Sequence, residues 1–291
     1  STPCEHSFPT RRSSDLCPSK GTCNEQECSK MLPKYGNVKN IIGIISGKGG
    51  VGKSTVTGIL AAELCKKGYK VGVLDADITG PSMPRILGVN NERARMLQVE
   101  GKENEPQLIP VETKTGIKVM SLNLLIEGED QPVIWRGPLI TGVLNQMYSD
   151  TLWGELDYLL IDMPPGTGDV ALTIMQSMPL NGMVVVSTPQ DMVSMIVKKV
   201  VVMIEKMNIN LLGIVENMAY IQCGSCGEKV RVFSKKPAEE HVKYLGAPLL
   251  AEMPINLDMV ESLEKGEMES YIRNSEVYNE LVNNFMNNLN K

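Results

Sequence analysis

A glycine-rich segment at residues 47–55 carries the strongest chemical signal in the sequence. It reads Gly47-Lys48-Gly49-Gly50-Val51-Gly52-Lys53-Ser54-Thr55. This fits the pattern G-x-x-x-x-G-K-[ST], which cradles nucleotide phosphates where a strand leads into a helix. The glycines let successive N–H groups converge on phosphate oxygens. We expect Lys53 to reach the β- and γ-phosphates and the Ser54 hydroxyl to ligate Mg²⁺. The alternative, a glycine-rich turn without a ligand, is disfavoured by the strand and helix patterns on either side.

Aspartates that follow two apolar runs could complete a nucleotide site. Because the carboxyl ends of parallel strands meet at one edge of a sheet, Asp75, Asp77 and Asp162 can all face the phosphate loop. We predict that Asp162 holds Mg²⁺ through its water shell, that Asp77 orients an attacking water, and that Asp75 supports the metal shell. A turn or N-cap role is the alternative for Asp75. The segment Gly166-Thr167-Gly168 is predicted to be a mobile switch, because glycine hinges permit movement.

The pair Cys223-Gly224-Ser225-Cys226 indicates a site for a soft metal. Two thiolates at this spacing can chelate one metal, and the following Gly227 suits a tight turn around it. A thioredoxin-like redox pair would open a helix after a strand, whereas β-prone residues follow here. One pair supplies only two of the four ligands that zinc or a [4Fe–4S] cluster takes, so a symmetric dimer could complete the set. A zinc ribbon remains the alternative.

The N-terminal region adds thiols in a polar segment with little sign of structure: Cys17, Cys23 and Cys28. Their spacing matches no standard zinc pattern, so a cluster site and a flexible tail with incidental thiols both remain open. Residues 1–16 include a stretch that resembles the conceptual translation of a common sequencing-adapter oligonucleotide. We interpret them as a non-native segment. Cys65, alone in a helical pattern, is expected to be a buried, inert thiol.

The composition is that of an ordinary globular chain. Its 291 residues include 29 Lys and Arg against 34 Asp and Glu, a formal charge of −5. This mild acidity gives no general footprint for nucleic acid or anionic lipid, and we expect neither nucleic acid nor membrane as a partner. No apolar run reaches the ~18 residues of a membrane helix. Without an export signal, we expect a reducing cytoplasmic setting, where clustered cysteines indicate metal or redox chemistry.

Alternating apolar runs and helical patterns must position these groups. Strands are predicted at residues 40–46, 70–74, 156–162, 182–188, 211–217 and 248–254, and helices at 53–67, 137–152, 169–176, 192–207 and 236–245. The strands are rich in successive Ile, Val and Leu, as parallel strands covered on both faces are. The alternation predicts an α/β fold with a doubly wound, mostly parallel sheet.

Two segments depart from this alternation. Residues 108–113 and 117–125 are predicted to form an antiparallel β-hairpin inserted after the second strand. Apolar residues at helical spacing between Tyr278 and Met286 predict a C-terminal helix, with Ser275 as its N-cap.

Taken together, the motifs resemble the Mrp/ApbC-type iron–sulfur carrier ATPases, relatives of the eukaryotic cytosolic iron–sulfur scaffolds. The resemblance spans about Val38 to Gly266 and rests on residues 47–55, 75–82, 135–138, 162–169 and 213–218 and on the cysteine pair. A second lysine early in the loop, Lys48, resembles the deviant Walker A subgroup, whose members dimerise face to face and reach across to the partner's nucleotide. Its spacing alone also allows an ordinary solvated lysine.

The resemblance implies a P-loop NTPase that slowly hydrolyses ATP with Mg²⁺. It also implies a homodimer that assembles a labile [4Fe–4S] cluster between two cysteine pairs and transfers it to apoproteins. Cys223 and Cys226 would be the cluster ligands, Lys48 and Lys53 catalytic residues, and Asn217 the contact to the adenine base. The motif Trp135-Arg136-Gly137-Pro138 receives no role beyond packing. The N-terminal cysteines depart from the four-cysteine arrangement of the eukaryotic relatives, so the resemblance gives no support for a second stable cluster.

On this basis the chain divides into the non-native residues 1–16, a flexible cysteine-containing segment at 17–36, and a P-loop ATPase domain at 37–291 that includes the Cys-x-x-Cys loop. The alternatives are a ParA/MinD-like positioning ATPase, a nitrogenase-type electron donor and a zinc-stabilised nucleotide-binding module. The first needs a basic DNA-binding face or a membrane helix, yet the last helix is rich in Asn and has only Lys291 as a cation. The second holds its cluster with widely separated single cysteines. Tight zinc without iron would favour the third.

Overall fold

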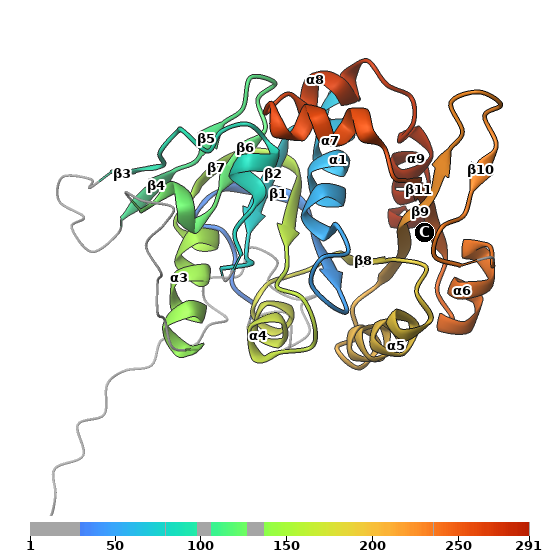
Figure 1. Cartoon of the computed structure of the whole chain (residues 1–291). Helices are drawn as coiled ribbons and strands as arrows, with labels where there is room; N and C mark the ends of the chain where they lie inside the picture. The colour runs from blue at the N-terminus through green and yellow to red at the C-terminus, as the bar shows by residue number, and fades with distance from the viewer. Residues whose placement is uncertain (1–29, 79, 98–105, 127–136, 235, 291) are drawn as a thin grey trace, which may run out of the picture.

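A large, mostly parallel sheet organises the fold (Figure 1). The computed structural model describes residues 30–78, 80–97, 106–126, 137–234 and 236–290. Within these residues, nine strands form one sheet in the order β10-β9-β8-β1-β7-β2-β6-β5, and β11 pairs with β9 as well. All pairs are parallel except those of β5 with β6 and β10 with β9. The predicted α/β class and mostly parallel sheet are confirmed.

The strands that build this sheet follow the apolar runs of the sequence. They are β1 (Tyr35–Ser46), β2 (Val71–Asp75), β5 (Val111–Glu112), β6 (Lys118–Met120), β7 (Leu152–Asp162), β8 (Gly182–Ser187), β9 (Leu211–Gln222), β10 (Lys229–Val230) and β11 (Leu249–Pro254). All six parallel strands predicted from the sequence are present. β1 begins earlier than expected, because its first residues pair with the start of β7.

Helices cover both faces of the sheet. They are α1 (Lys53–Lys66), α2 (Met83–Ile86), α3 (Gly137–Ser149), α4 (Asp169–Ser177), α5 (Asp191–Lys206), α6 (Ala238–Leu245), α7 (Leu257–Glu264), α8 (Met268–Arg273) and α9 (Asn279–Leu289). One hydrophobic core lies between the sheet and helices α1, α2, α7, α8 and α9, and a second between the sheet and α3 to α6. Figure 1 shows these two layers on opposite sides of the strands.

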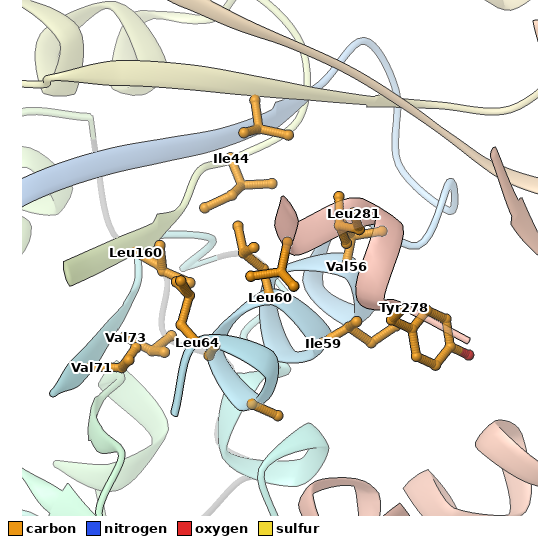
Figure 2. Packing of buried hydrophobic residues seen from close by; sticks show 14 of the residues in the cluster. Ile44, Val56, Ile59, Leu60, Leu64, Val71, Val73, Leu160, Tyr278 and Leu281 are labelled. Atoms are coloured by element: carbon orange, nitrogen blue, oxygen red, sulfur yellow. The ribbon is translucent and has the colours of Figure 1, made fainter. Parts of the chain in front are cut away.

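Helix α1 is enclosed by apolar groups on most sides. Val56, Ile59, Leu60 and Leu64 are at most 1% exposed. Figure 2 shows these side chains meeting residues of β1, β2 and β7 on one side and of α9 on the other. Because α1 is wedged between the sheet and the C-terminal helices, the phosphate loop that precedes it has a fixed support.

The predicted hairpin is present but becomes the edge of the main sheet. β5 and β6 form its arms, and β6 pairs in parallel with β2. The preceding residues form β4 (Gln107–Ile109), which pairs instead with β3 (Arg95–Leu97) in a separate two-stranded sheet. After Met120 the chain turns into a short 3₁₀ helix at Leu122–Leu124, so the second predicted arm ends early.

The predicted C-terminal helix is confirmed as α9, but its N-cap was wrong. Tyr278 is the N-cap residue. Ser275 lies three residues before it, and its hydroxyl accepts a hydrogen bond from the Val277 N–H instead. Two amides of α9 reach the sheet: Asn284 Nδ2 donates to Leu250 O of β11 at 2.8 Å, and Asn288 Nδ2 to Leu212 O of β9 at 2.9 Å. The asparagines of this helix therefore satisfy strand carbonyls.

Candidate functional site

The glycine-rich loop lies where the sequence predicts, between β1 and α1. Gly50 and Gly52 both have φ near +80°, a conformation that favours glycine. A Cβ at Gly49 or Gly50 would meet nothing within 4 Å, so the loop presents open backbone. A Cβ at Gly52 would lie 2.2 Å from the Asn217 amide nitrogen, which donates to Val51 O at 3.0 Å. Asn217 therefore packs directly on the loop, next to the N-terminus of α1.

Lys53, Ser54 and Asp162 form one buried cluster at the start of α1. The carboxyl ends of β1 and β7 lie side by side, with Ile44 paired to Asp162. Lys53 Nζ lies 2.8 Å from Asp162 Oδ1, and Ser54 Oγ donates to Asp162 Oδ2 at 2.6 Å. Asp162 is fully buried and Lys53 only 6% exposed. Burial strengthens this charge pair, because little water screens it.

Asp77 joins the edge of this cluster. Its Oδ2 lies 3.7 Å from Lys53 Nζ, and its side chain is 14% exposed. The structure thus brings together the predicted phosphate lysine, the predicted Mg²⁺ residues and the residue predicted to orient water. A carboxylate at this position can accept a proton or a hydrogen bond from a water molecule that enters from solvent.

Asp75 holds the loop that carries Asp77. Its Oδ1 accepts from the Asp77 N–H at 3.3 Å, and its Oδ2 accepts from the N–H groups of Ser82 and Met83 and from Ser121 Oγ, each at 3.1 Å. These bonds favour the turn and N-cap role over the support of a metal shell. Burial, with a further contribution from the charge of Asp162, raises the pKa of Asp75 to about 7.

This raised pKa predicts an unusual pH dependence of stability. A folded-state pKa above the unfolded value of an Asp means that the folded chain holds the extra proton, so stability falls as pH rises from about 4 to about 7. Asp75→Asn should reduce the loss in the free energy of unfolding between about pH 5 and pH 8 by about 2 kcal/mol. Urea unfolding at constant ionic strength measures it. Asp157→Asn is the control, because Lys39 holds the pKa of that carboxyl below its usual range, so its titration does not contribute between about pH 5 and pH 8.

The remaining loop residues lie around this cluster. Lys48 Nζ lies 3.2 Å from Gln190 Oε1, in a solvent-accessible contact. The predicted switch contacts the end of β1, directly before the loop, since the Gly166 N–H donates to Ser46 O at 2.7 Å. Gly166 has φ of +84°. Trp135 and Arg136 lie outside the described residues, as do Cys17, Cys23 and Cys28.

Cys223 and Cys226 lie apart from the phosphate loop, at the tip of a hairpin. The cysteine hairpin, as we name residues 221–230, consists of the end of β9, the loop 223–228 and β10. The Cys223 N–H donates to Glu228 O and the Gly227 N–H to Cys223 O, each at 2.9 Å, which closes a tight loop. The N–H groups of Cys226 and then Ser225 point at the Cys223 sulfur and hold the pKa of this thiol below its usual range. Such a thiol is a ready metal ligand.

The other thiol of the described residues, Cys65, is half-buried on α1, where Sγ lies 3.4 Å from Thr115 O. It lies outside both candidate sites. Within residues 30–290, less the gaps given above, no group of three or more His, Cys, Asp or Glu side chains could hold a metal. The two cysteines of the hairpin therefore need further ligands from elsewhere to complete a four-ligand site.

The sequence analysis missed several supporting residues. Thr57 Oγ1 lies 2.9 Å from Asp162 Oδ1, one helical turn after Lys53. The spacing of Lys53 and Thr57 (i, i+4) on a predicted helix was a usable signal, because such residues share a face. Ser121 had no local signal, because only the tertiary fold brings its hydroxyl to Asp75.

The arrangement of loop, lysine and strand-end carboxylates defines a P-loop NTPase. Residues 37–290 match the family described as "NUBPL iron-transfer P-loop NTPase", within the ParA group, and the chain belongs to this family. The resemblance to iron–sulfur carrier ATPases is confirmed at this level.

Named relatives agree with this family. The chain is 62% identical over 258 residues to the "Iron-sulfur cluster carrier protein" of Clostridium perfringens, covering 89% of this chain and 90% of that one. A Methanocaldococcus jannaschii protein of the same name is 45% identical, with 87% of each covered. A solved nucleotide-binding protein from Archaeoglobus fulgidus, in complex with ADP, is 40% identical with a TM-score of 0.69, over 82% of this chain and 92% of that one.

More distant structures share the fold alone. The cell division ATPase MinD of Pyrococcus furiosus is 23% identical, with a TM-score of 0.60 over 87% of this chain and 98% of that one. None of the helices in the described part of the chain is long and apolar enough to cross a membrane.

Proposed function

We propose that this protein is an ATP-dependent carrier of iron–sulfur clusters. Two copies would hold one [4Fe–4S] cargo between their cysteine pairs and pass it to apoproteins. The observation that carries the proposal is the cysteine hairpin, which presents two thiols at its tip on a nucleotide-binding scaffold. Because one pair supplies two ligands where the cluster takes four, a second copy related by a twofold axis would complete the set. The names of the close relatives support this function.

The residues around the loop fit ATP and Mg²⁺. Open backbone at Gly49 and Gly50 can receive phosphate oxygens, and the N-terminus of α1 adds its partial positive charge. Ser54 and, through water, Asp162 would hold Mg²⁺, which neutralises charge on the phosphates when bound. Asn217, which donates to Val51 O, would contact the adenine base, as the family resemblance implies.

Within this proposal the lysines and Asp77 carry the hydrolysis. Lys53 would turn from Asp162 to the β- and γ-phosphates, and Asp77 would orient the attacking water. Lys48, whose Nζ donates to the neutral amide of Gln190, would reach the nucleotide of the partner copy. Loss of the γ-phosphate would release the switch at residues 166–168, so that the nucleotide acts as a timer for cargo transfer.

Anaerobic reconstitution tests the proposal. We expect the wild type to bind iron and sulfide and to transfer them to an apo-enzyme at a rate that depends on ATP. The double variant Cys223→Ala/Cys226→Ala should retain about a tenth or less of the iron, because soft-metal coordination needs the thiolates. Cys65→Ala is the matched control and should load iron fully. Iron and sulfide per dimer, together with the oligomeric state, are the measurements.

Three results would contradict this proposal. A wild-type protein that stays monomeric and free of iron after reconstitution would exclude a shared cluster. Tight zinc binding without iron would identify the zinc-stabilised module instead. Equal iron in the double variant would move the cargo site away from the cysteine hairpin.

A further inference from the structure

A polar cluster beside the cysteine hairpin has no part in the function proposed above. Glu216 of β9 is 3% exposed, and its Oε2 lies 2.7 Å from His241 Nδ1 on α6. The other ring nitrogen of His241, Nε2, lies 3.3 Å from Ser234 Oγ. Arg231 forms a two-point ion pair with Glu252 of β11, in which Nη2 lies 3.2 Å from Oε2. Arg231 and Ser234 belong to residues 231–234, the arm that follows the cysteine hairpin. This arm is linked to β11 through Arg231 and to β9 through Ser234 and His241.

Because Glu216 is buried, the position of its carboxyl group depends on the hydrogen bond with His241. Burial raises the pKa of Glu216, and the His241 ring opposes this rise. The second oxygen, Oε1, is buried and has no hydrogen-bond partner among the described residues. A buried carboxylate loses several favourable contacts with water, so its remaining hydrogen bond constrains its position strongly. Movement of β9 at Glu216 should therefore move His241 as well.

Asn217, the residue after Glu216, is hydrogen-bonded to the phosphate loop. Successive side chains on a strand point to opposite faces. Accordingly, Ile214 lies in the core beneath α3 to α6, whereas Val215 lies in the core beneath α1. Glu216 points to the first face, towards α6, and Asn217 to the second, where it donates to Val51 O.

The strand then runs directly into the cysteine hairpin. Met218 has φ of +56°, a left-handed conformation that is uncommon outside glycine. Four residues later β9 ends at Gln222, next to Cys223. Strand β9 thus contacts the phosphate loop through Asn217, contacts His241 through Glu216, and leads directly into the cysteines.

We propose that Glu216 and His241 are positioning residues that transmit nucleotide binding at the phosphate loop to the cysteine hairpin. A nucleotide that engages the Asn217 amide takes it from Val51, and β9 adjusts at residues 216–218. The Glu216–His241 contact carries this adjustment through Ser234 to the arm behind the cysteines. The link rests on the nucleotide contact of Asn217 in the proposed function, but it does not depend on the identity of the cargo.

Alkylation of the cysteines tests the link without any iron. The reduced full chain is treated with iodoacetamide, with and without a non-hydrolysable ATP analogue plus Mg²⁺, and mass spectrometry follows the peptide that contains Cys223 and Cys226. In the wild type we expect nucleotide to change this alkylation rate about fivefold. In Glu216→Gln/His241→Phe the ratio should fall to near one, while the affinity for the analogue stays unchanged.

The design separates a broken link from a damaged fold. The double variant leaves no buried charge unpaired, and the alkylation rate of Cys65 in the same sample reports any general loosening. His241→Asn is the conservative companion, because its amide can still donate to Glu216, and it should restore part of the nucleotide response. Asp157→Asn, which breaks a surface ion pair with Lys39, should respond as the wild type does.

A full nucleotide response in the double variant overturns the proposal, and so does a wild type whose cysteines do not respond to nucleotide. Because no iron is present, either result is obtained independently of reconstitution. A chain that fails to load iron would refute the carrier function and leave this link standing.

Discussion

Lys53→Ala should lower the ATP hydrolysis rate by about 1000-fold, the upper range for removing one preorganised charge from a transition state. Lys53 is the buried ammonium of the loop, 2.8 Å from Asp162 and 3.7 Å from Asp77. No other described cation lies in this cluster. Phosphate release at saturating ATP and Mg²⁺ measures the rate, and a fluorescent analogue measures binding.

The fold should survive this substitution. Asp162 keeps the Ser54 hydroxyl at 2.6 Å and has Thr57 Oγ1 at 2.9 Å, so the buried carboxylate retains hydrogen-bonding partners. Lys67→Ala is the matched control, since this lysine follows α1 on the surface and bonds Asn283 Oδ1 at 3.1 Å. It should hydrolyse ATP at the wild-type rate. Hydrolysis by Lys53→Ala within about threefold of wild type would remove Lys53 from the reaction.

Gly52→Ala should have the second-largest effect, on both nucleotide binding and stability. The new Cβ would lie 2.2 Å from Asn217 Nδ2, at a residue with φ of +80°. Something must move, and either the loop or Asn217 is displaced. We expect a loss of about 3 kcal/mol in stability, the sum of the left-handed conformation and overpacking. Affinity for ATP should fall about 100-fold, because the loop and the Asn217 contact are distorted together.

Gly50→Ala separates the two causes. Gly50 also has φ of +80°, but its Cβ would meet nothing within 4 Å. Without nucleotide, Gly50→Ala should therefore lower the free energy of unfolding by only about 1 kcal/mol, the cost of the left-handed conformation. Denaturant unfolding of both variants gives the difference. Equal losses for the two would show that Asn217 does not pack tightly on the loop in solution.

The sequence predicted the elements that local pattern controls. Successive branched residues mark each parallel strand, and the loop motif places Lys53 at the start of α1. Because parallel strands end together, the proximity of Asp162 and Asp77 to Lys53 also followed from the order of elements. These inferences need only periodicity and chain direction.

Contacts set by tertiary packing could not be read in this way. The role of Asp75 depends on three loop N–H groups and on Ser121, which lies more than forty residues further along the chain. The Glu216–His241 pair joins a strand to a helix across the core face. Helices α2, α7 and α8 are short, and their apolar patterns cover too few turns to stand out.

The position of α9 has a consequence for how the protein is made. The core around α1 is completed by Tyr278, Leu281, Val282 and Phe285. The side chains of Asn284 and Asn288 donate hydrogen bonds to carbonyls of β11 and β9. Domains generally fold as units during synthesis. The core on this side of the sheet stays open during synthesis until α9 has been made and can pack against α1. A chain that lacks α9 should therefore expose the apolar groups around α1 and be prone to aggregate.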